Sequence, residues 1–181
     1  GGAQEYFGVK ADLCTYGKIL GGGMPIGAIA GDKRFMDFID GGHWQYGDDS
    51  APTNELVFFA GTFSKHPLTM VSALATLKMF KGQGSKLISE LTQKTLDLAN
   101  RLNEVFLQEK VNIKCDSFSS LFRFSGRVNL DPLFLFLNTE GFYVWEGRNM
   151  FISTKHSDDD IDQFVKAVKK GIKRFYSNDE N

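Results

Sequence analysis

The sequence predicts an α/β fold made of two units, and three observations indicate it. Short apolar runs separated by glycines fill residues 1–60, as is typical of strands joined by tight connections. Helical periodicity then takes over from Pro67. In the last third, short apolar runs alternate with amphipathic helices, the pattern of a small α+β domain. We therefore expect part of an α/β layer over residues 1–82 and a smaller α+β domain over residues 83–181.

The composition of the chain excludes several classes of partner. Its 181 residues are 42% hydrophobic and 24% charged, with a net charge of -1, which suits a globular chain that buries a core. This balance gives no electrostatic reason to expect nucleic acid or a membrane surface, and no apolar run approaches the roughly 20 residues of a membrane span. The two cysteines lie far apart in apolar runs, so we expect free thiols and a cytoplasmic protein.

The first unit is expected to hold three strands and a short helix. Residues 12–16 and 25–30 are predicted to be buried strands, and the glycines between them mark a tight connection. Residues 33–39 suggest a short helix, and residues 56–60 a third strand. Residues 41–54 are rich in turn-forming residues and long for a loop, so they are either functional or mobile. The opening residues have neither an initiator methionine nor the pattern of a helix or strand, so the chain reads as part of a longer one.

Two helices are expected in the middle of the chain. Pro67 suits a first helical turn, and a break is expected at residues 82–84, where Gly82 and Gly84 flank one glutamine. A second amphipathic helix should follow, because apolar residues recur at helical spacings; they are Leu87, Leu91, Leu98, Leu102, Val105 and Phe106.

The last third is predicted to alternate strands with helices. The expected strands cover residues 111–113, 120–124, 142–145 and 150–153, with a helix over residues 131–137. A final helix should begin after Ser157, whose hydroxyl can cap it, and three aspartates suit the positive end of its dipole. We expect the residues from about Gly84 onward to be ordered as a unit of their own.

Lys18 differs from the other lysines in its setting. It directly follows a predicted strand and stands between Gly17 and the triplet Gly21-Gly22-Gly23. An amine at the rim of a core has a lowered pKa and becomes nucleophilic toward carbonyls, and glycines let a bulky ligand approach. From these local features alone, a lysine that simply reaches solvent is the more ordinary interpretation.

Other glycine-rich and metal-binding motifs do not fit. A P-loop needs its lysine after the glycines and before a Ser or Thr, whereas Lys18 precedes them and Ile19 follows. A dinucleotide fingerprint that starts at Gly21 would need glycine where Ile26 stands. The histidines are scattered without ligand spacing, so no metal site is expected.

A second candidate segment is Gly61-Thr62-Phe63-Ser64-Lys65-His66-Pro67. Here hydroxyl residues follow a predicted strand and precede a helix, and free backbone N–H groups with a helix dipole can bind phosphate. An ordinary helix cap explains the same pattern.

Two long stretches resemble a known family. GGAQEYFGVKADLCTYGKILGGGMPIGAIAGDKRFMD and AGTFSKHPLTMVSALATL resemble the class III, glutamate-1-semialdehyde aminomutase-like branch of fold-type-I pyridoxal 5'-phosphate (PLP) enzymes. The resemblance implies that Lys18 holds PLP as a Schiff base and later shuttles a proton. It also implies that Thr62, after Gly61, binds the cofactor phosphate of the opposite subunit, so the protein would be a homodimer.

The resemblance also carries expectations about extent and fold. Residues 1–82 would be the rear part of the PLP-binding large domain, and residues 83–181 the small C-terminal domain. The chain would be the C-terminal half of such an enzyme, because the family's phosphate loop, its stacking aromatic residue and its pyridinium-binding acid all lie N-terminal to this segment. An inactive fragment that lacks half of the cofactor site is therefore one open alternative.

Finer features resemble aminotransferase modules of hybrid polyketide/non-ribosomal peptide synthetases. The stretches GGHWQYGD, GTFSKHP and WEGRNMFISTKHSDDDID carry this likeness. It implies transfer from an amino-acid donor to the keto group of a β-ketoacyl chain on an acyl carrier protein. An aminomutase, which moves an amine within one molecule, remains the other enzymatic alternative.

Two further residues are candidates for substrate contact. Arg148 follows a glycine near a predicted strand and could clamp a donor carboxylate with two hydrogen bonds; an ion pair with Glu146 or residues 158–160 is the alternative. Trp44, with Tyr46, could line the acceptor channel, and ordinary packing is the alternative for both.

Overall fold

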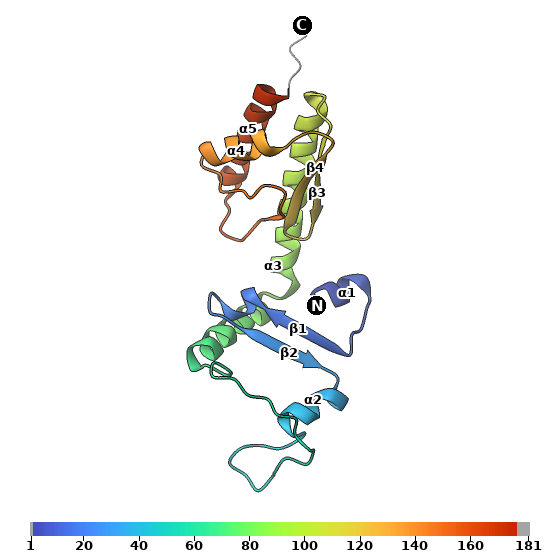
Figure 1. The fold of residues 1–181 in the computed structure, drawn as a ribbon, viewed down its shortest axis with the longest axis vertical. Coiled ribbons are helices and arrows are strands. Elements are labelled where there is room, and N and C mark those ends of the chain that lie inside the picture. The colour runs from blue at the N-terminus through green and yellow to red at the C-terminus, as the bar shows by residue number, and fades with distance from the viewer. Residues whose placement is uncertain (1, 177–181) are drawn as a thin grey trace. The chain divides into compact units, whose positions relative to one another are not determined.

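The computed structural model describes residues 2–176 and divides the chain into two compact units, with the boundary between Gly82 and Gln83 (Figure 1). One helix, α3 (Pro67–Gln108), contributes residues to both units. No helix among residues 2–176 is both long enough and apolar enough to cross a membrane.

The first unit contains one two-stranded antiparallel sheet. Strand β1 (Leu13–Gly17) pairs with strand β2 (Gly27–Gly31), so that Leu13 lies opposite Gly31 and Gly17 opposite Gly27. Both strands confirm those predicted over residues 12–16 and 25–30. Helix α2 (Lys33–Asp40) follows β2, as expected, and the Asp32 side chain caps it by accepting a hydrogen bond from the Arg34 N–H at 2.9 Å.

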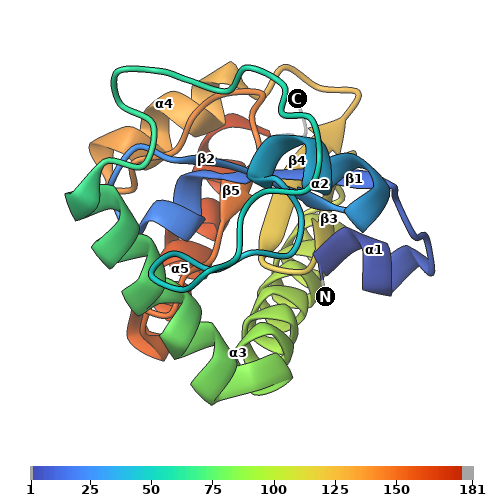
Figure 2. The same ribbon diagram turned by 90° about the horizontal axis from the view of Figure 1, so that it is seen from below.

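Two expectations for the first unit are wrong. Residues 2–7 form a short helix, α1 (Gly2–Phe7), where none was expected. Residues 56–60 form no strand; they belong to a long connection between α2 and α3 that contains neither helix nor strand (Figure 2). The Val57 N–H is bonded to the Phe38 carbonyl at 2.8 Å, and an apolar run becomes a strand only where a neighbouring strand pairs with it.

The expected break at residues 82–84 is also wrong, because α3 runs through them without interruption. Glycine costs a helix interior about 1 kcal/mol but keeps its backbone N–H, so it weakens a helix without ending it, in contrast to proline. Two glycines in a 42-residue helix are tolerable on this account.

The first unit buries little of its apolar surface. Among the described residues up to Gly82, Ala73 is the single hydrophobic residue that counts as buried. Leu13 and Tyr16 were expected in a buried strand, yet 48% and 50% of their surfaces are exposed. A two-stranded sheet has two faces, and within this unit nothing covers both of them.

The second unit is a three-stranded antiparallel sheet with helices. The sheet order is β3–β4–β5, and its elements are β3 (Ile113–Phe118), β4 (Leu121–Gly126), α4 (Asp131–Thr139), β5 (Met150–Phe151) and α5 (Asp158–Phe175). The strand expected at residues 142–145 is absent, because the Phe142 N–H bonds the Leu137 carbonyl at 2.9 Å and so continues the end of α4. Of the strand expected over residues 150–153, only Met150 and Phe151 form a strand.

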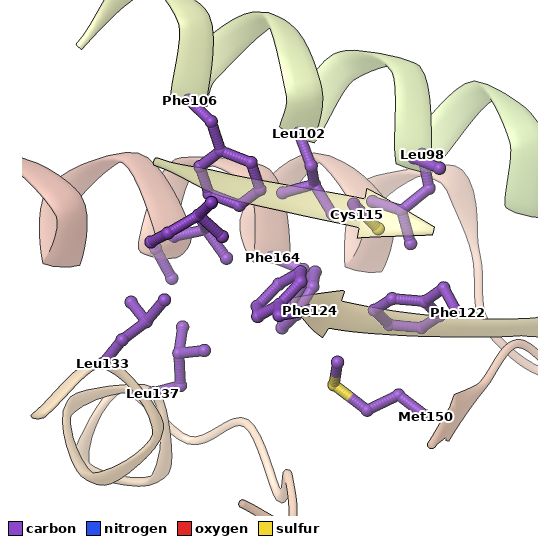
Figure 3. Close-up of a cluster of buried hydrophobic side chains, with 14 of the residues drawn as sticks. Leu98, Leu102, Phe106, Cys115, Phe122, Phe124, Leu133, Leu137, Met150 and Phe164 are labelled. Atoms are coloured by element: carbon purple, nitrogen blue, oxygen red, sulfur yellow. The ribbon is translucent and has the colours of Figure 1, made fainter. Parts of the chain in front are cut away.

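A single hydrophobic core holds the second unit together. Leu98, Leu102 and Phe106 of α3 face Cys115 of β3 and Phe124 of β4 (Figure 3). Leu133 and Leu137 of α4 close another side, and residues of α5 complete the cluster: Ile161, Phe164, Ala167, Val168 and Ile172. Leu98, Leu102, Leu133 and Leu137 are fully buried.

The start of α5 confirms the capping predicted from the sequence. The Ser157 hydroxyl accepts the Asp160 N–H at 3.1 Å, and the Asp160 carboxylate accepts the Ser157 N–H at 2.7 Å. This reciprocal pair satisfies two backbone donors that a helix start leaves free.

Candidate functional site

Lys18 occupies an unusual backbone position at the end of β1. It is the first residue of a short 3-10 turn, η1 (Lys18–Gly21), and its φ of 49° lies in the left-handed region. That conformation costs a residue with a side chain about 1–2 kcal/mol, and such residues cluster at functional sites. The side chain is exposed and makes no ion pair or hydrogen bond with any described residue. Its amine is therefore free to react.

The glycines after Lys18 close the turn. The Gly22 N–H donates to the Ile19 carbonyl and the Met24 N–H to the Gly21 carbonyl, each at 3.1 Å. Gly22 has a φ of 58°, and a Cβ there would lie 2.6 Å from Thr76 Oγ1 and 2.8 Å from Ser72 Oγ. Both the backbone angle and the close approach of α3 thus require glycine at this position.

Thr62 lies in a second turn, just before α3. The Ser64 N–H donates to the Gly61 carbonyl at 2.9 Å, and the Thr62 side chain is exposed. A Cβ at Gly61 would lie 2.8 Å from Ser64 Oγ, so the turn packs against this glycine. Because α3 begins at Pro67, its free N–H groups follow the Thr62 hydroxyl closely in the chain, a combination that suits a phosphate group.

Lys18 and Thr62 are not joined directly. No hydrogen bond links them anywhere in residues 2–176. Each instead neighbours the first turns of α3: the Lys18 turn through Gly22 and Ser72, and the Thr62 turn through the chain that enters the helix at Pro67.

Trp44 lines a pocket in the first unit. The pocket has a volume of about 580 Å³ and is lined by Ile39, Asp40, Trp44, residues 56–59 and Lys65. The Trp44 indole N–H donates to the Asp40 carbonyl at 2.5 Å, which fixes the ring against the end of α2. Tyr46 is 94% exposed and does not line this pocket.

Arg148 lies in the second unit and does not form the expected ion pair. Its guanidinium stacks over the Trp145 ring, 5.2 Å from the centroid, and among residues 2–176 no carboxylate pairs with it. The neighbouring Asp131 carboxyl raises the pKa of the Glu146 carboxyl, while Asp158 pairs with Lys94 at 2.8 Å. The ion-pair alternative is therefore wrong for the described residues, and the guanidinium is exposed.

Among the described residues, the arrangement offers an unpaired amine and groups that suit phosphate, but no cluster that suits a metal. No cluster of three or more His, Cys, Asp or Glu side chains that could hold a metal exists within the described part of the chain. Sequence reasoning overlooked Ser72, which contacts the Lys18 turn; its one visible signal is a hydroxyl, with others at Thr69 and Thr76, in a stretch of α3 where most residues are apolar.

Comparisons with known proteins place the chain in a family. The model of the aminotransferase class-III family matches residues 2–114. Glutamate-1-semialdehyde 2,1-aminomutase of Alkaliphilus oremlandii is 34% identical over 187 residues, which cover 95% of this chain and 40% of the relative. The corresponding aminomutase of Acetivibrio thermocellus is also 34% identical, over 93% of this chain. The chain thus spans about 40% of the length of these curated relatives.

Solved structures agree in fold. A β-phenylalanine aminotransferase from Variovorax paradoxus matches with a TM-score of 0.77 and 26% identity, covering 94% of this chain and 40% of that one. A transaminase with PLP bound matches with a TM-score of 0.78 over 96% of this chain and 40% of its own, at 22% identity, which shows a common fold. With more than half of its residues matched by the family model, the chain belongs to the class-III aminotransferase family.

Proposed function

We propose that this chain is part of a PLP-dependent aminotransferase in which Lys18 carries the cofactor. One observation supports it above the others: an exposed amine with no partner among residues 2–176 is held in a left-handed turn, inside a stretch that resembles the family's lysine motif. The match to the aminotransferase class-III family supports the activity. A structural neighbour with PLP bound supports the cofactor.

The residues present suit PLP on chemical grounds. PLP has an aldehyde, which an unpaired amine such as that of Lys18 can attack, and a phosphate. Thr62 supplies an exposed hydroxyl five residues before the start of α3, and the free N–H groups of a helix start are donors that bind phosphate in many enzymes. A Cβ added at Gly23 would meet no atom within 4 Å, so the backbone there leaves space for a bulky ring near Lys18.

The chain's own residues would perform two tasks in the reaction. When bound, PLP supplies an electron sink that withdraws electrons from the carbon next to the amine. Lys18 Nζ would hold the cofactor covalently until a donor amine displaces it. The freed Nζ would then take the proton from the α-carbon of the donor and deliver it to the cofactor, acting as general base and acid.

A homodimer would complete the site. Thr62, with Gly61, is proposed to bind the phosphate that the partner subunit holds, in line with the family resemblance and with the lack of any bond between Thr62 and Lys18. The exposed apolar surface of the first unit, which includes Phe58 and Phe63 at 96% and 82% exposure, needs a protein partner to cover it. We propose that the family's missing N-terminal half and a second subunit provide this cover in a cytoplasmic enzyme.

The acceptor is proposed to be a keto group on a β-ketoacyl chain held by an acyl carrier protein. The amino-acid sequences of the loop around Trp44 and of residues 145–162 support this assignment, because they resemble those of the synthetase modules. Trp44 also lines a pocket that an acyl chain could enter. Arg148, which is exposed and has no carboxylate partner among residues 2–176, is the proposed clamp for the donor carboxylate.

A glutamate-1-semialdehyde-type aminomutase is the second candidate, because the curated relatives bear that name. The aminotransferase and the aminomutase activities give different products when the complete protein is mixed with an amino-acid donor and no acceptor. An aminotransferase releases about one equivalent of keto acid per site and stops, because its half-reaction needs no acceptor. An aminomutase releases none, since its amine stays on the same molecule.

The cofactor assignment is tested by mapping the attached lysine. Borohydride reduction of the complete protein with PLP, followed by peptide mapping, should label the peptide that contains Lys18. Lys18→Arg should abolish the label and transamination, because Arg cannot form the bond at neutral pH. Lys33→Arg is the matched control, since Lys33 lies in α2 and faces Asp37 at 3.9 Å. A label on Lys33 or Lys65 in the unchanged protein, or no label at all, would refute the assignment.

A further inference from the structure

The hydroxyl of Ser72 ties the Lys18 turn to α3. Ser72 Oγ donates to the Gly21 carbonyl at 2.7 Å, across 51 residues of sequence, and lies 3.4 Å from the Gly22 carbonyl. In the described part of the chain, no other side-chain hydrogen bond reaches residues 18–24. Gly21, which ends the turn that begins with Lys18, is buried.

The backbone at Gly22 lies close to two side chains of α3, those of Ser72 and Thr76. Where Gly22 has no side chain, a Cβ would lie 2.6 Å from Thr76 Oγ1 and 2.8 Å from Ser72 Oγ. Thr76 itself bonds within the helix, donating to the Ser72 carbonyl at 3.1 Å. The two hydroxyls therefore have different roles: Ser72 bonds the turn, and Thr76 only borders it.

We propose that Ser72 is a positioning residue for Lys18, an inference that rests on the proposed function. Lys18 and Gly21 belong to the same short 3-10 turn, so a shift of the Gly21 carbonyl also moves the backbone of Lys18. The bond from Ser72 holds that carbonyl on a long helix, and it thereby fixes the place from which Nζ reaches the cofactor. Such fixing of a reacting group raises the rate of a reaction without adding a new contact to the reactant.

The reaction that reports this positioning is the attachment of PLP. Lys18 Nζ attacks the aldehyde carbon of PLP, a carbon–nitrogen double bond forms, and the aldehyde oxygen leaves as water. The rate of this step depends on where Nζ lies, whereas the preceding noncovalent binding depends on other groups such as the phosphate site.

The variant Ser72→Ala separates positioning from general stability. Alanine has a higher helix propensity than serine, so the substitution favours α3 while it removes the bond to Gly21. A purely structural role would leave the attachment rate unchanged well below the melting temperature. Ser72→Thr keeps a hydroxyl and serves as the conservative rescue, and Thr76→Ala removes a hydroxyl four residues away that bonds only within the helix.

The experiment mixes the cofactor-free form of the complete protein with increasing PLP and follows covalent attachment to Lys18 by absorbance. In Ser72→Ala, the rate constant at saturating PLP should fall about three- to tenfold, the factor that corresponds to one lost hydrogen bond, at an unchanged half-saturating concentration. Ser72→Thr should restore most of the rate, and Thr76→Ala should match the unchanged protein. Gly22→Ala should also slow attachment, because its methyl group pushes the turn away from α3.

An unchanged rate in Ser72→Ala or in Gly22→Ala would overturn the proposal, as would an equal loss in Thr76→Ala. A failure of the proposed function is recognised separately, because PLP would then attach to no lysine, or to one other than Lys18, in the unchanged protein. That result removes the positioning role along with the function.

Discussion

At the scale of single residues, the proposed cofactor lysine and the buried cysteine contrast in their surroundings. Lys18 is exposed, strained and without a partner among residues 2–176, whereas Cys115 is buried in the core of the second unit. Its N–H and carbonyl are both bonded to the Asn103 side-chain amide, at 2.7 Å and 3.0 Å. Burial, with a smaller contribution from the Asp116 carboxylate, raises the pKa of the Cys115 thiol to about 12.

The raised pKa of Cys115 predicts a loss of stability in alkali. The ordinary pKa is 9.0, so above that pH the unfolded chain releases the thiol proton while the folded chain keeps it. The free energy of unfolding should therefore be unaffected by this group below pH 9 and should fall as the pH rises toward about 12. Denaturant titrations across this range measure the slope, and Cys115→Ala should reduce it.

Thiol labelling gives an independent check of the same prediction. In the folded protein, a thiol reagent should modify the half-buried Cys14 first and Cys115 only on unfolding, since the thiolate is the reactive form. Equal labelling rates for both cysteines in the folded protein would contradict it.

The residues of the candidate site differ in how far the sequence could predict them. Lys18 and Thr62 were selected by the resemblance of their surrounding sequences to family motifs, because local features alone favoured a solvent-exposed lysine and an ordinary helix cap. Ser72 was not predictable in this way, because its role depends on a carbonyl 51 residues earlier in the chain. Arg148 was predicted as a candidate, but its stacking on Trp145 follows from the local fold of residues 145–148.

At the scale of elements, α3 contains a glycine whose surroundings are open. Gly82 lies inside the helix, and a Cβ added there would meet no atom within 4 Å. Gly171 in α5 is the opposite case, because a Cβ there would lie 2.7 Å from Leu133 Cδ1 and 2.9 Å from Phe136 Cδ1. The two helical glycines are therefore matched in conformation and differ in the space around them.

We expect opposite effects from alanine at these two positions. Gly82→Ala should raise helix content and increase the free energy of unfolding by about 0.5–1 kcal/mol, because it removes the entropy cost of glycine. Gly171→Ala should lower that free energy by about 1–3 kcal/mol, because its methyl group overpacks the contact between α4 and α5. Circular dichroism and denaturant unfolding measure both. A destabilising Gly82→Ala would show that α3 is interrupted there.

Elements stabilised by local interactions were predicted best from the sequence. The cap of α5 and the strands β1 and β2 were found, because a cap and a short apolar run bounded by glycines can both be recognised from neighbouring residues. The strands expected at residues 56–60 and 142–145 were not formed, since an apolar run needs a pairing partner that a sequence pattern does not specify. The glycines near residue 82 were overrated as helix breakers because the long helix around them was not considered.

At the scale of the whole molecule, the buried apolar side chains are unevenly divided. With the exception of Ala73, every buried hydrophobic residue in the described part of the chain lies between Leu98 and Ile172. Hydrophobic burial contributes about 25 cal/mol per Å² of apolar surface, so the second unit has far more of this stabilisation than the first.

We predict that residues 83–181 fold on their own and that residues 1–82 do not. The separate second unit should melt cooperatively and protect the amides of β3, β4 and α5 from hydrogen exchange, because it holds the core cluster. The separate first unit should show no cooperative transition in calorimetry. A cooperative transition in residues 1–82 alone, or its absence in residues 83–181, would contradict this account.

The sheet of the first unit has a consequence for synthesis in the cell. Because β1 and β2 pair with no other strand of residues 2–176, each leaves one edge unpaired by a strand, and such free edges recruit strands from other chains. The aggregation of chains through such edges increases with protein concentration and with time. If the proposed partner surfaces cover this sheet, any delay in that assembly would expose newly made chains to chaperones and proteases.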